Sequence, residues 1–431
     1  MKKRAHTLLQ WTGLGAAVGV ACGASSAVFL ILLERATRLR ESHEFIVYTL
    51  PIAGAVIGLL YERWGASIKG GNNLVLDTIH ENSPQIPLRM APMVLLGTVL
   101  THLFGGSAGR EGTAVQMGAS LADEIAHRLG VTSDTRRRLL AAGIAGGFGS
   151  VFGTPIAGTI FGMEVVSIGR IEYDAFFPAL VASIVGDMVT RGLGVVHTPY
   201  PRIGQVALTA PVVGKLFVMA VAMALATVAF VELTHRLKRL LEKRIPRLPV
   251  RMFFGGITVV AMWKLIGTSD YLGLGVPTIV RSFVDPGLPW YAFAAKLVFT
   301  SVTLASGFLG GEVTPLFFVG ATLGNVVARG LDLPIELGAG IGLAAVFGAA
   351  ANTPVALSIM AVELLGGAAL PHVMIVAAIA YILTGHRGIY PAQRIHVRKH
   401  GGVLRAPTAL RDYRDSEGPP SETGDLKEGG P

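Results

Sequence analysis

The chain has 431 residues, of which 51% are hydrophobic and only 15% charged, and it contains 55 glycines. Its mean hydropathy is +0.56, and its formal net charge is +9. Soluble domains contain about 45–50% apolar residues including glycine, and this chain exceeds that share. The composition therefore excludes an ordinary soluble enzyme, a disordered protein and a nucleic-acid-binding protein, and it predicts an all-α polytopic membrane protein.

Apolar segments of spanning or near-spanning length recur along the whole chain. In chain order they cover residues 11–34, 45–62, 87–104, 113–127, 139–168, 175–195, 211–235, 252–266, 291–309, 315–328, 337–350, 353–365 and 369–384. Several are shorter than the ~20 residues that a membrane span requires, and glycine or proline interrupts many of them. Short, interrupted segments are typical of broken and re-entrant helices whose ends meet inside the membrane.

Lysine and arginine gather between the apolar segments, as the positive-inside rule describes. Basic clusters lie at 136–138, 236–251 and 387–405. We interpret the last two as cytoplasmic, which predicts a cytoplasmic C-terminus and a bacterial inner-membrane location. The one cysteine, Cys22, lies inside the first apolar segment. The sequence therefore offers no disulfide framework and no cysteine metal site, and we expect neither a metal nor another cofactor.

The chain contains an internal repeat. Residues 148–157 contain Phe-Gly and then Thr-Pro-x-Ala, and Glu164 follows them. The same pattern recurs over residues 347–356, followed by Glu363. The offset is 199, the difference between 363 and 164. A second match, GASL from Gly118 and GATL from Gly320, has an offset of 202. Two homologous halves with broken helices are typical of transporters that bind their substrate where the halves meet. Parallel and inverted halves both fit the sequence.

We therefore expect one membrane transport domain over residues 1–395, with repeat halves at about 11–235 and 250–395 and a basic linker between them. From about His396 onward the chain turns polar. Residues 396–431 are predicted to form a short disordered tail, too short for a regulatory domain.

The densest glycine cluster is GGSAGREGT at 105–113, which opens an apolar helical run. Glycines at the N-terminus of a helix expose backbone N–H groups, and an anion is favoured there. Glu111 lies in that first turn, where its carboxylate would compete with a bound anion for the same donors until protonation moves it aside. An ionisable residue inside a membrane indicates function because its burial is costly. A helix cap or a pair with Arg110 is the alternative.

Two further glycine-led helix openings are GGEVTP at 310–315 and KGGNN at 69–73. The first is the repeat equivalent of the 105–113 cluster, with Pro315 in its first helical turn. Three such openings would direct several positive helix ends at one anion. For each motif taken alone, close packing of small residues in the membrane is the alternative.

These motifs resemble those of the CLC family of chloride channels and anion/proton antiporters. GREGT at 109–113 resembles the family's GREGP, GEVTP at 311–315 its GxFAP, and GNNLV at 71–75 stands where the family has GSGIP. Tyr390 matches the tyrosine that coordinates the anion near the end of the membrane domain. The resemblance covers roughly residues 10–395, and it implies a CLC-type fold and a homodimer with one pathway in each subunit.

Several residues depart from the family pattern. Asn72, followed by Asn73, replaces the serine of GSGIP, and Thr113 replaces the proline of GREGP. Glu312 adds a second acidic residue beside the ion path. Val165 stands where proton-coupled chloride exchangers of the family carry an inner glutamate. This combination is similar to the fluoride-exporting branch, which exchanges fluoride for protons without the inner glutamate.

The chemistry of fluoride agrees with these departures. Fluoride is small and strongly hydrated, so strong donors must lie close together to replace its water. An asparagine amide offers two N–H donors where serine offers one O–H, and protonated Glu312 or Glu111 could donate a short O–H hydrogen bond. Because HF crosses membranes and leaves fluoride trapped in a more alkaline cytoplasm, export driven by inward protons would relieve its accumulation.

The resemblance implies a role for each of these residues. Glu111 would be the gating and proton-carrying glutamate, and Glu312 would act on the same path, with a structural pair to a neighbouring helix as the alternative. The residues expected to contact the anion, through side chains or backbone N–H groups, are Asn72, Asn73, Gly112, Val313, Thr314 and Tyr390. Glu164 and Glu363 occupy equivalent repeat positions, so we expect both to be structural rather than part of a proton route.

We predict a fluoride/proton antiporter that exports cytoplasmic fluoride and is not an enzyme. Its partners would be fluoride, protons, the bilayer and a second copy of the chain, with no nucleic acid. The alternative within the family is a channel for chloride or another anion, or a chloride/proton exchanger. A membrane hydrolase is the alternative from another class, because GGSAG around Ser107 fits G-x-S-x-G and His102 lies nearby. That motif needs a preceding strand, whereas this segment lies between membrane helices.

Overall fold

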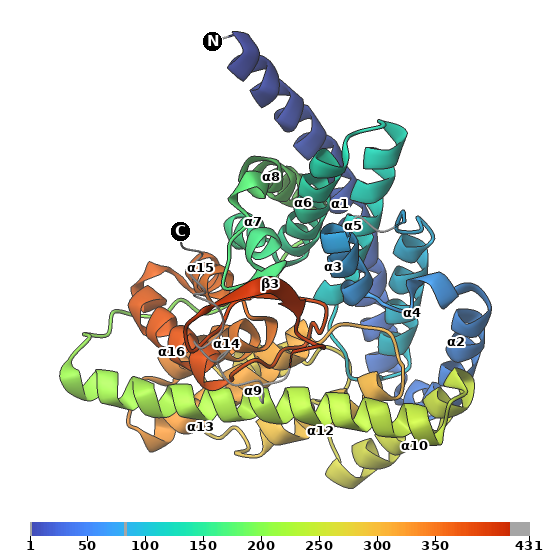
Figure 1. Ribbon diagram of the computed structural model, residues 1–431. Helices are drawn as coiled ribbons and strands as arrows, with labels where there is room; N and C mark the ends of the chain where they lie inside the picture. Colours follow the sequence, from blue (N-terminus) through green and yellow to red (C-terminus); the bar gives the residue numbers. More distant parts are fainter. Residues whose placement is uncertain (1, 82–83, 414–431) are drawn as a thin grey trace, which may run out of the picture.

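The computed structural model describes residues 2–81 and 84–413, which form an almost entirely helical protein (Figure 1). The helices of the first half are α1 (Lys2–Ser42), α2 (Leu50–Trp64), α3 (Asn72–Glu81), α4 (Met90–Leu103), α5 (Glu111–Arg128), α6 (Ser133–Phe152), α7 (Pro155–Glu164) and α8 (Phe176–Gly192). Those that follow are α9 (Ala210–Arg244), α10 (Leu248–Ile266), α11 (Val276–Arg281), α12 (Ala292–Ala305), α13 (Val313–Gly330), α14 (Ile335–Ala351), α15 (Pro354–Leu365) and α16 (Leu370–Leu383).

Many of these helices are too short to cross a membrane. Among the described residues, the helical stretches long and apolar enough to do so are His6–Ser42, Glu44–Trp64, Tyr173–Gly192, Ala210–Arg244 and Leu248–Ile266. Most of the remaining helices have between 10 and 18 residues, and several are apolar. The prediction of a helical membrane protein with broken helices is confirmed.

The apolar segment predicted over 139–168 contains two helices, α6 and α7. The break lies at Gly153, whose φ of +73° ends α6, and Pro155 then begins α7. A left-handed residue followed by proline is a strong stop because neither continues a helix. The second half breaks in the same way, since Asn352 (φ +58°) ends α14 and Pro354 begins α15.

A small sheet joins a short segment of the first half to the C-terminal end of the described chain. β1 (Ser167–Ile168) pairs in parallel with β2 (Arg394–Val397), which pairs antiparallel with β3 (Val403–Ala409). Ile168, Ile395 and Leu410 are buried together there. The prediction of a disordered tail from residue 396 is therefore wrong up to residue 413, because β3 pairs with β2, which in turn pairs with a strand from the first half. Residues 414–431 lie outside the described part of the chain.

Short 3-10 helices lead into or connect several of the longer elements. They are η1 (Glu44–Thr49), η2 (Ala66–Ile68), η3 (Tyr173–Ala175) and η4 (Gly367–Ala369). η1 leads directly into α2, and η3 leads directly into α8.

Glycine allows the two halves to use the same close helix packing. In the first half, a Cβ added to Gly118 of α5 would lie 2.3 Å from the carbonyl oxygen of Gly143 of α6. In the second half, a Cβ added to Gly320 of α13 would lie 2.0 Å from the carbonyl oxygen of Gly342 of α14. Real Cβ atoms do not approach backbone this closely, so the helices are in contact through backbone alone. Such packing is typical of membrane helices.

Gly342→Ala is expected to destabilise the fold, because the new Cβ would meet the Gly320 carbonyl oxygen at 1.9 Å. Overpacking of this kind typically costs about 1–3 kcal/mol of the free energy of unfolding, and we expect the upper end here. Thermal unfolding in detergent measures it. Gly214→Ala is the control, since Gly214 lies on the exposed face of α9 with open space around it. Equal unfolding midpoints for the two variants would contradict the packing described above.

Candidate functional site

A short backbone bridge joins the two halves at the centre of the site. The Gly109 N–H donates to the Gly311 carbonyl oxygen at 2.6 Å, and the Gly311 N–H donates to the Gly109 carbonyl oxygen at 2.8 Å. A Cβ at Gly109 would lie 2.9 Å from that Gly311 oxygen, so glycine is required. Because α5 begins at Glu111 and α13 at Val313, the bridge brings together the N-termini of two helices from different halves.

The segment before this bridge is held by the second half. The Gly273 N–H donates to the Gly106 carbonyl oxygen at 3.1 Å. The Ser107 N–H donates to the Thr303 hydroxyl at 3.2 Å, and the hydroxyls of Ser107 and Thr300 are 2.9 Å apart. These contacts fix the loop that leads into α5, so the position of Glu111 depends on residues far away in the sequence.

The hydrolase alternative for Ser107 has no support in this geometry. Both ring nitrogens of His102 contact backbone carbonyl oxygens, Nδ1 that of Thr98 at 2.8 Å and Nε2 that of Ala108 at 2.9 Å. The Ser107 hydroxyl is bonded to Thr300 instead, and a helix, α4, precedes the motif rather than a strand. Ser107 and His102 therefore hold the loop and do not form a nucleophile–base pair.

The side chain of Glu111 is fully buried and reaches the other half of the protein. Its Oε2 accepts a hydrogen bond from the Thr314 backbone N–H at 3.1 Å, and the Thr314 hydroxyl lies 2.6 Å from both carboxylate oxygens. Thr314 lies in the first turn of α13. The carboxylate thus occupies the N–H and O–H donors at a helix N-terminus, which is where an anion is favoured.

Glu111 also pairs with Arg110, as the alternative interpretation expected. The Arg110 Nε lies 3.3 Å from Oε1, and the Arg110 backbone N–H donates to Oε2 at 3.2 Å. The two sets of contacts are compatible. The carboxylate has donors on its own side of the bridge and donors from the opposite half.

The neighbours of Glu111 on α5 and α13 are closely packed. Gly112 and Val313 are buried. Thr113, which stands where the family has proline, places its hydroxyl 2.7 Å from the hydroxyl of Thr98 on α4. Thr113, a threonine in place of proline, therefore connects α5 to α4 through its hydroxyl.

The two asparagines at the start of α3 have different environments. Gly71, with φ +54°, turns the chain into this helix. The amide nitrogen of Asn72 would lie 3.1 Å from a Cβ added to Gly112, so this side chain faces the start of α5. Its Oδ1 is buried and has no hydrogen-bond partner among the described residues. Asn73 accepts a hydrogen bond from the Ala392 N–H at 3.0 Å and so connects α3 to the segment after Tyr390.

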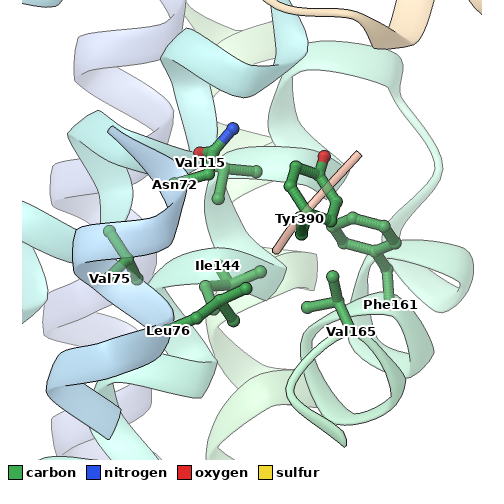
Figure 2. Close-up of a pocket in the computed structure, with 8 residues that line it drawn as sticks. All are labelled: Asn72, Val75, Leu76, Val115, Ile144, Phe161, Val165 and Tyr390. Atoms are coloured by element: carbon green, nitrogen blue, oxygen red, sulfur yellow. The ribbon is translucent and has the colours of Figure 1, made fainter. Parts of the chain in front are cut away.

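Asn72 and Tyr390 lie at one end of a small cavity (Figure 2). The cavity has a volume of about 10 Å³, which is room for one water molecule at most. Apolar side chains form the rest of its wall: Val75, Leu76, Val115, Ile144, Phe161 and Val165. Val165, at the position of the family's inner glutamate, therefore contributes an apolar surface directly beside the site.

A much larger cavity, of about 980 Å³, adjoins the same residues, and we call it the vestibule. Its inner end includes Asn72, Asn73, Thr113, Glu312 and Tyr390. Most of the charged side chains in the rest of its wall are basic, namely Lys69, Lys238, Arg239, Arg251, Arg387 and Arg411, against the acidic Glu62, Glu232 and Glu242. An excess of positive charge in a concave surface concentrates anions.

Glu312 is placed where the vestibule meets the site. It is the N-cap residue of α13, and it lines the vestibule together with Lys238. Glu312 and Tyr390 both belong to the vestibule wall. The residues that the motifs singled out thus fall into two neighbouring groups. One lines the vestibule, namely Asn72, Asn73, Glu312 and Tyr390, and the other lies at the starts of α5 and α13, namely Glu111, Gly112, Val313 and Thr314.

Glu164 and Glu363 cap each other's helices. Glu164, at the end of α7, accepts hydrogen bonds from the backbone N–H groups of Val355 (3.1 Å) and Ala356 (2.7 Å) at the start of α15. Glu363, near the end of α15, accepts from those of Ile156 (3.0 Å) and Ala157 (2.7 Å) at the start of α7. This reciprocal pair joins the halves and satisfies helix ends, as the expected structural role requires.

The sequence analysis missed Gln393. Its amide nitrogen donates to the carbonyl oxygens of Val165 at 2.9 Å and Ala351 at 2.8 Å, and its Oε1 accepts from Asn352 at 2.9 Å. These bonds anchor the segment that carries Tyr390. The available signal was an amide residue three positions after the tyrosine, directly beyond the last apolar segment.

Comparison with known proteins identifies the family. The chain matches the family model of the voltage gated chloride channel over residues 53–385. A chloride/fluoride channel protein of Pseudomonas syringae pv. tomato is 46% identical over 417 residues, which cover 94% of this chain and 91% of that protein. The chain therefore belongs to the CLC family of anion channels and antiporters, and it is an integral membrane protein with the predicted CLC-type fold.

Solved structures agree with this assignment. A CLC-type fluoride/proton antiporter superimposes with a TM-score of 0.87 at 38% identity, covering 90% of this chain and 98% of the other. A slow cyanobacterial Cl⁻/H⁺ antiporter superimposes with a TM-score of 0.76 at 16% identity, over 88% of this chain and 94% of the other. The second likeness is one of fold alone.

Glu164→Gln and Glu363→Gln are each expected to lower the free energy of unfolding by about 1–3 kcal/mol, because the new amide nitrogen would face a backbone N–H. Thermal unfolding in detergent measures this loss. Glu34→Gln is the control, since Glu34 pairs with Arg38 on the surface with 61% of its side chain exposed. A structural role predicts that anion flux persists in Glu164→Gln with any proton coupling unchanged. Loss of that coupling in a stable Glu164→Gln variant would contradict it.

Proposed function

We propose that the protein is a fluoride/proton antiporter that exports fluoride from a bacterial cytoplasm in exchange for protons. The observation that carries the proposal is the Glu111 carboxylate on the Thr314 N–H and O–H donors. An incoming anion needs the same donors, so it must displace the carboxylate. A displaced carboxylate in a buried site is costly unless it takes up a proton, and anion binding is thereby coupled to protonation.

The donors around this position favour fluoride. Strong, closely spaced donors are required to replace the hydration of a small anion. Asn72 and Tyr390 line the same cavities, and the Thr314 hydroxyl contacts the Glu111 carboxylate that the anion would displace. Glu312 would repel an anion while charged, whereas in its protonated form it donates a hydrogen bond. The similarity to a chloride/fluoride channel protein and to a fluoride/proton antiporter supports this choice of anion.

In this proposal the proton travels on residues of the anion path itself. Val165 places an apolar wall where an inner glutamate would otherwise stand. Glu111 carries the proton past the bridge, and Glu312 exchanges it with the vestibule. Gly112, Val313 and Asn73 complete the path as backbone and side-chain contacts.

The remaining features of the proposal concern assembly and orientation. We propose a homodimer with one pathway in each subunit, as the family resemblance implies, and one transport domain over 1–395 built from two repeat halves. Large apolar side chains are exposed on α7, α8, α15 and α16, namely Ile156, Met188, Val355 and Met374. They would contact lipid or the second copy. We propose that the side of the molecule with the basic residues at 236–251 and near the C-terminus faces the cytoplasm of an inner membrane, as the positive-inside rule describes.

A passive anion channel is the alternative function. The name of the Pseudomonas syringae relative, a chloride/fluoride channel protein, favours it. A chloride/proton exchanger is a further possibility within the family. The three functions differ in whether protons move with the anion and in the ratio of fluoride to chloride flux, so a single assay separates them.

The experiment uses proteoliposomes with the membrane potential clamped, and it records fluoride or chloride release together with external pH. We expect fluoride efflux with matching proton uptake in the wild type. Glu111→Gln should abolish the proton movement, because an amide cannot carry a proton. Glu34→Gln on the surface is the matched control. Fluoride efflux without proton movement, or equal efflux of chloride, would contradict the antiporter and favour a channel.

Asn72→Ser combined with Glu312→Ile tests the choice of anion. Each change removes donor capacity from the path, and losing hydrogen bonds of this kind is expected to reduce the fluoride-to-chloride flux ratio by about tenfold. The single variants divide the effect between the two residues. An unchanged ratio in the double variant would show that neither residue selects fluoride.

A further inference from the structure

We infer that an ion-pair clasp between α3 and the C-terminal hairpin sets the spacing of the anion-selecting residues. The clasp consists of Asp77 and Glu81 on α3 with Arg394 on β2 and Arg411 after β3. In Figure 1 the hairpin lies beside α3. The inference rests on the proposed function in one respect, namely that Asn72, Asn73 and Tyr390 select the anion. The clasp residues act through them as positioning residues.

Arg411 forms a bidentate ion pair with Asp77 on α3. Its Nη1 lies 2.9 Å from Oδ2 of Asp77, and its Nη2 lies 3.2 Å from Oδ1. Arg394 contacts Glu81 and lies 3.7 Å from Oδ1 of Asp77. A bidentate arginine–carboxylate pair fixes orientation as well as distance. The helix that begins with Asn72 is therefore held at two successive turns.

The backbone around Arg411 holds the segment that carries Tyr390. The Arg411 N–H donates to the Pro391 carbonyl oxygen at 2.9 Å, and the Leu410 N–H donates to that of Gln393 at 2.8 Å. Residue 411 is thus bonded to the Tyr390 segment through its backbone and to α3 through its guanidinium. The hydrogen bond from the Ala392 N–H to Asn73 is a second direct connection between the Tyr390 segment and α3.

This arrangement matters most for a small anion. Asn72 and Tyr390 come from segments more than 300 residues apart in the chain, and the contacts just described connect those segments directly. If the segments relax outward, donors lose contact with fluoride before they lose contact with the larger chloride. Loss of the clasp should therefore lower the preference for fluoride more than the overall rate.

The clasp is partly exposed, so its effect on the flux ratio can be tested in variants that still fold. The side chain of Arg411 is 43% exposed, and it lies on the wall of the vestibule rather than in the helical core. Exposed ion pairs contribute little to global stability. Replacing Arg411 should leave the membrane helices folded, and any effect on the flux ratio then reports positioning.

The test measures fluoride and chloride efflux in proteoliposomes for Arg411→Ala, Asp77→Ala, the double variant and Arg411→Lys. We expect the fluoride-to-chloride ratio to fall about threefold to fivefold in each alanine variant, the range of an exposed charge pair. The double variant should fall no further than Asp77→Ala, because that change already removes the pair between Arg411 and Asp77. Arg411→Lys should be intermediate, since an ammonium cannot form the fork. Arg128→Ala, which breaks a surface pair with Glu124, is the matched control.

A fluoride-to-chloride ratio within about twofold of the wild type in both alanine variants would overturn the clasp, because this change is too small for loss of a bidentate pair. A double variant whose ratio falls by the product of the two single effects would also overturn it. Size-exclusion profiles and unfolding midpoints establish that the variants are folded, and Arg411→Lys repeats the test with the charge kept. The proposed function is judged by proton uptake and by the wild-type ratio, whereas the clasp is judged by the change between variant and wild type. Either can therefore fail while the other stands.

Discussion

The two hydrogen bonds between Gly109 and Gly311 are the constraint on which the rest of the site depends. They join residues from different halves of the chain at a point where neither can carry a side chain. The helices that follow therefore begin side by side, and the Glu111 carboxylate reaches the donors of Thr314. Without this bridge the chain would have two separate helix N-termini, each able to attract an anion but neither supplied with a competing carboxylate from the other half.

Carboxylates that contact a helix N-terminus of the opposite half occur in two settings in this protein. Glu164 and Glu363 each cap a helix of the opposite half through two backbone N–H groups, and this reciprocal contact ties the halves together. Glu111 also lies at a helix N-terminus of the opposite half, where it contacts the Thr314 N–H and hydroxyl. Glu312 across the bridge and Thr113 on α5 line the vestibule. In the proposed function an anion displaces the Glu111 carboxylate, whereas Glu164 and Glu363 stay in place.

The resemblance that the motifs carry was sufficient to predict the CLC-type fold, and the glycine-led helix openings, which are local patterns, indicated the residues near its centre. The contacts that position those residues were not predictable in this way. Gln393, Arg411 and Asp77 act across large sequence separations, and each looks like an ordinary polar residue in its own segment. The strand β3 was missed because a polar stretch with a few apolar residues looks like a disordered tail in the sequence. Its partner is β2, which in turn pairs with the distant β1.

The central claim is that an anion and the Glu111 carboxylate compete for one set of donors, with protonation following displacement. Isothermal titration calorimetry of fluoride binding to the purified protein, repeated in buffers of different ionisation enthalpy, counts the protons taken up on binding. The account predicts proton uptake with fluoride binding in the wild type and a smaller uptake in Glu111→Gln, where Glu312 alone remains to take a proton. A binding enthalpy independent of buffer in the wild type would contradict it.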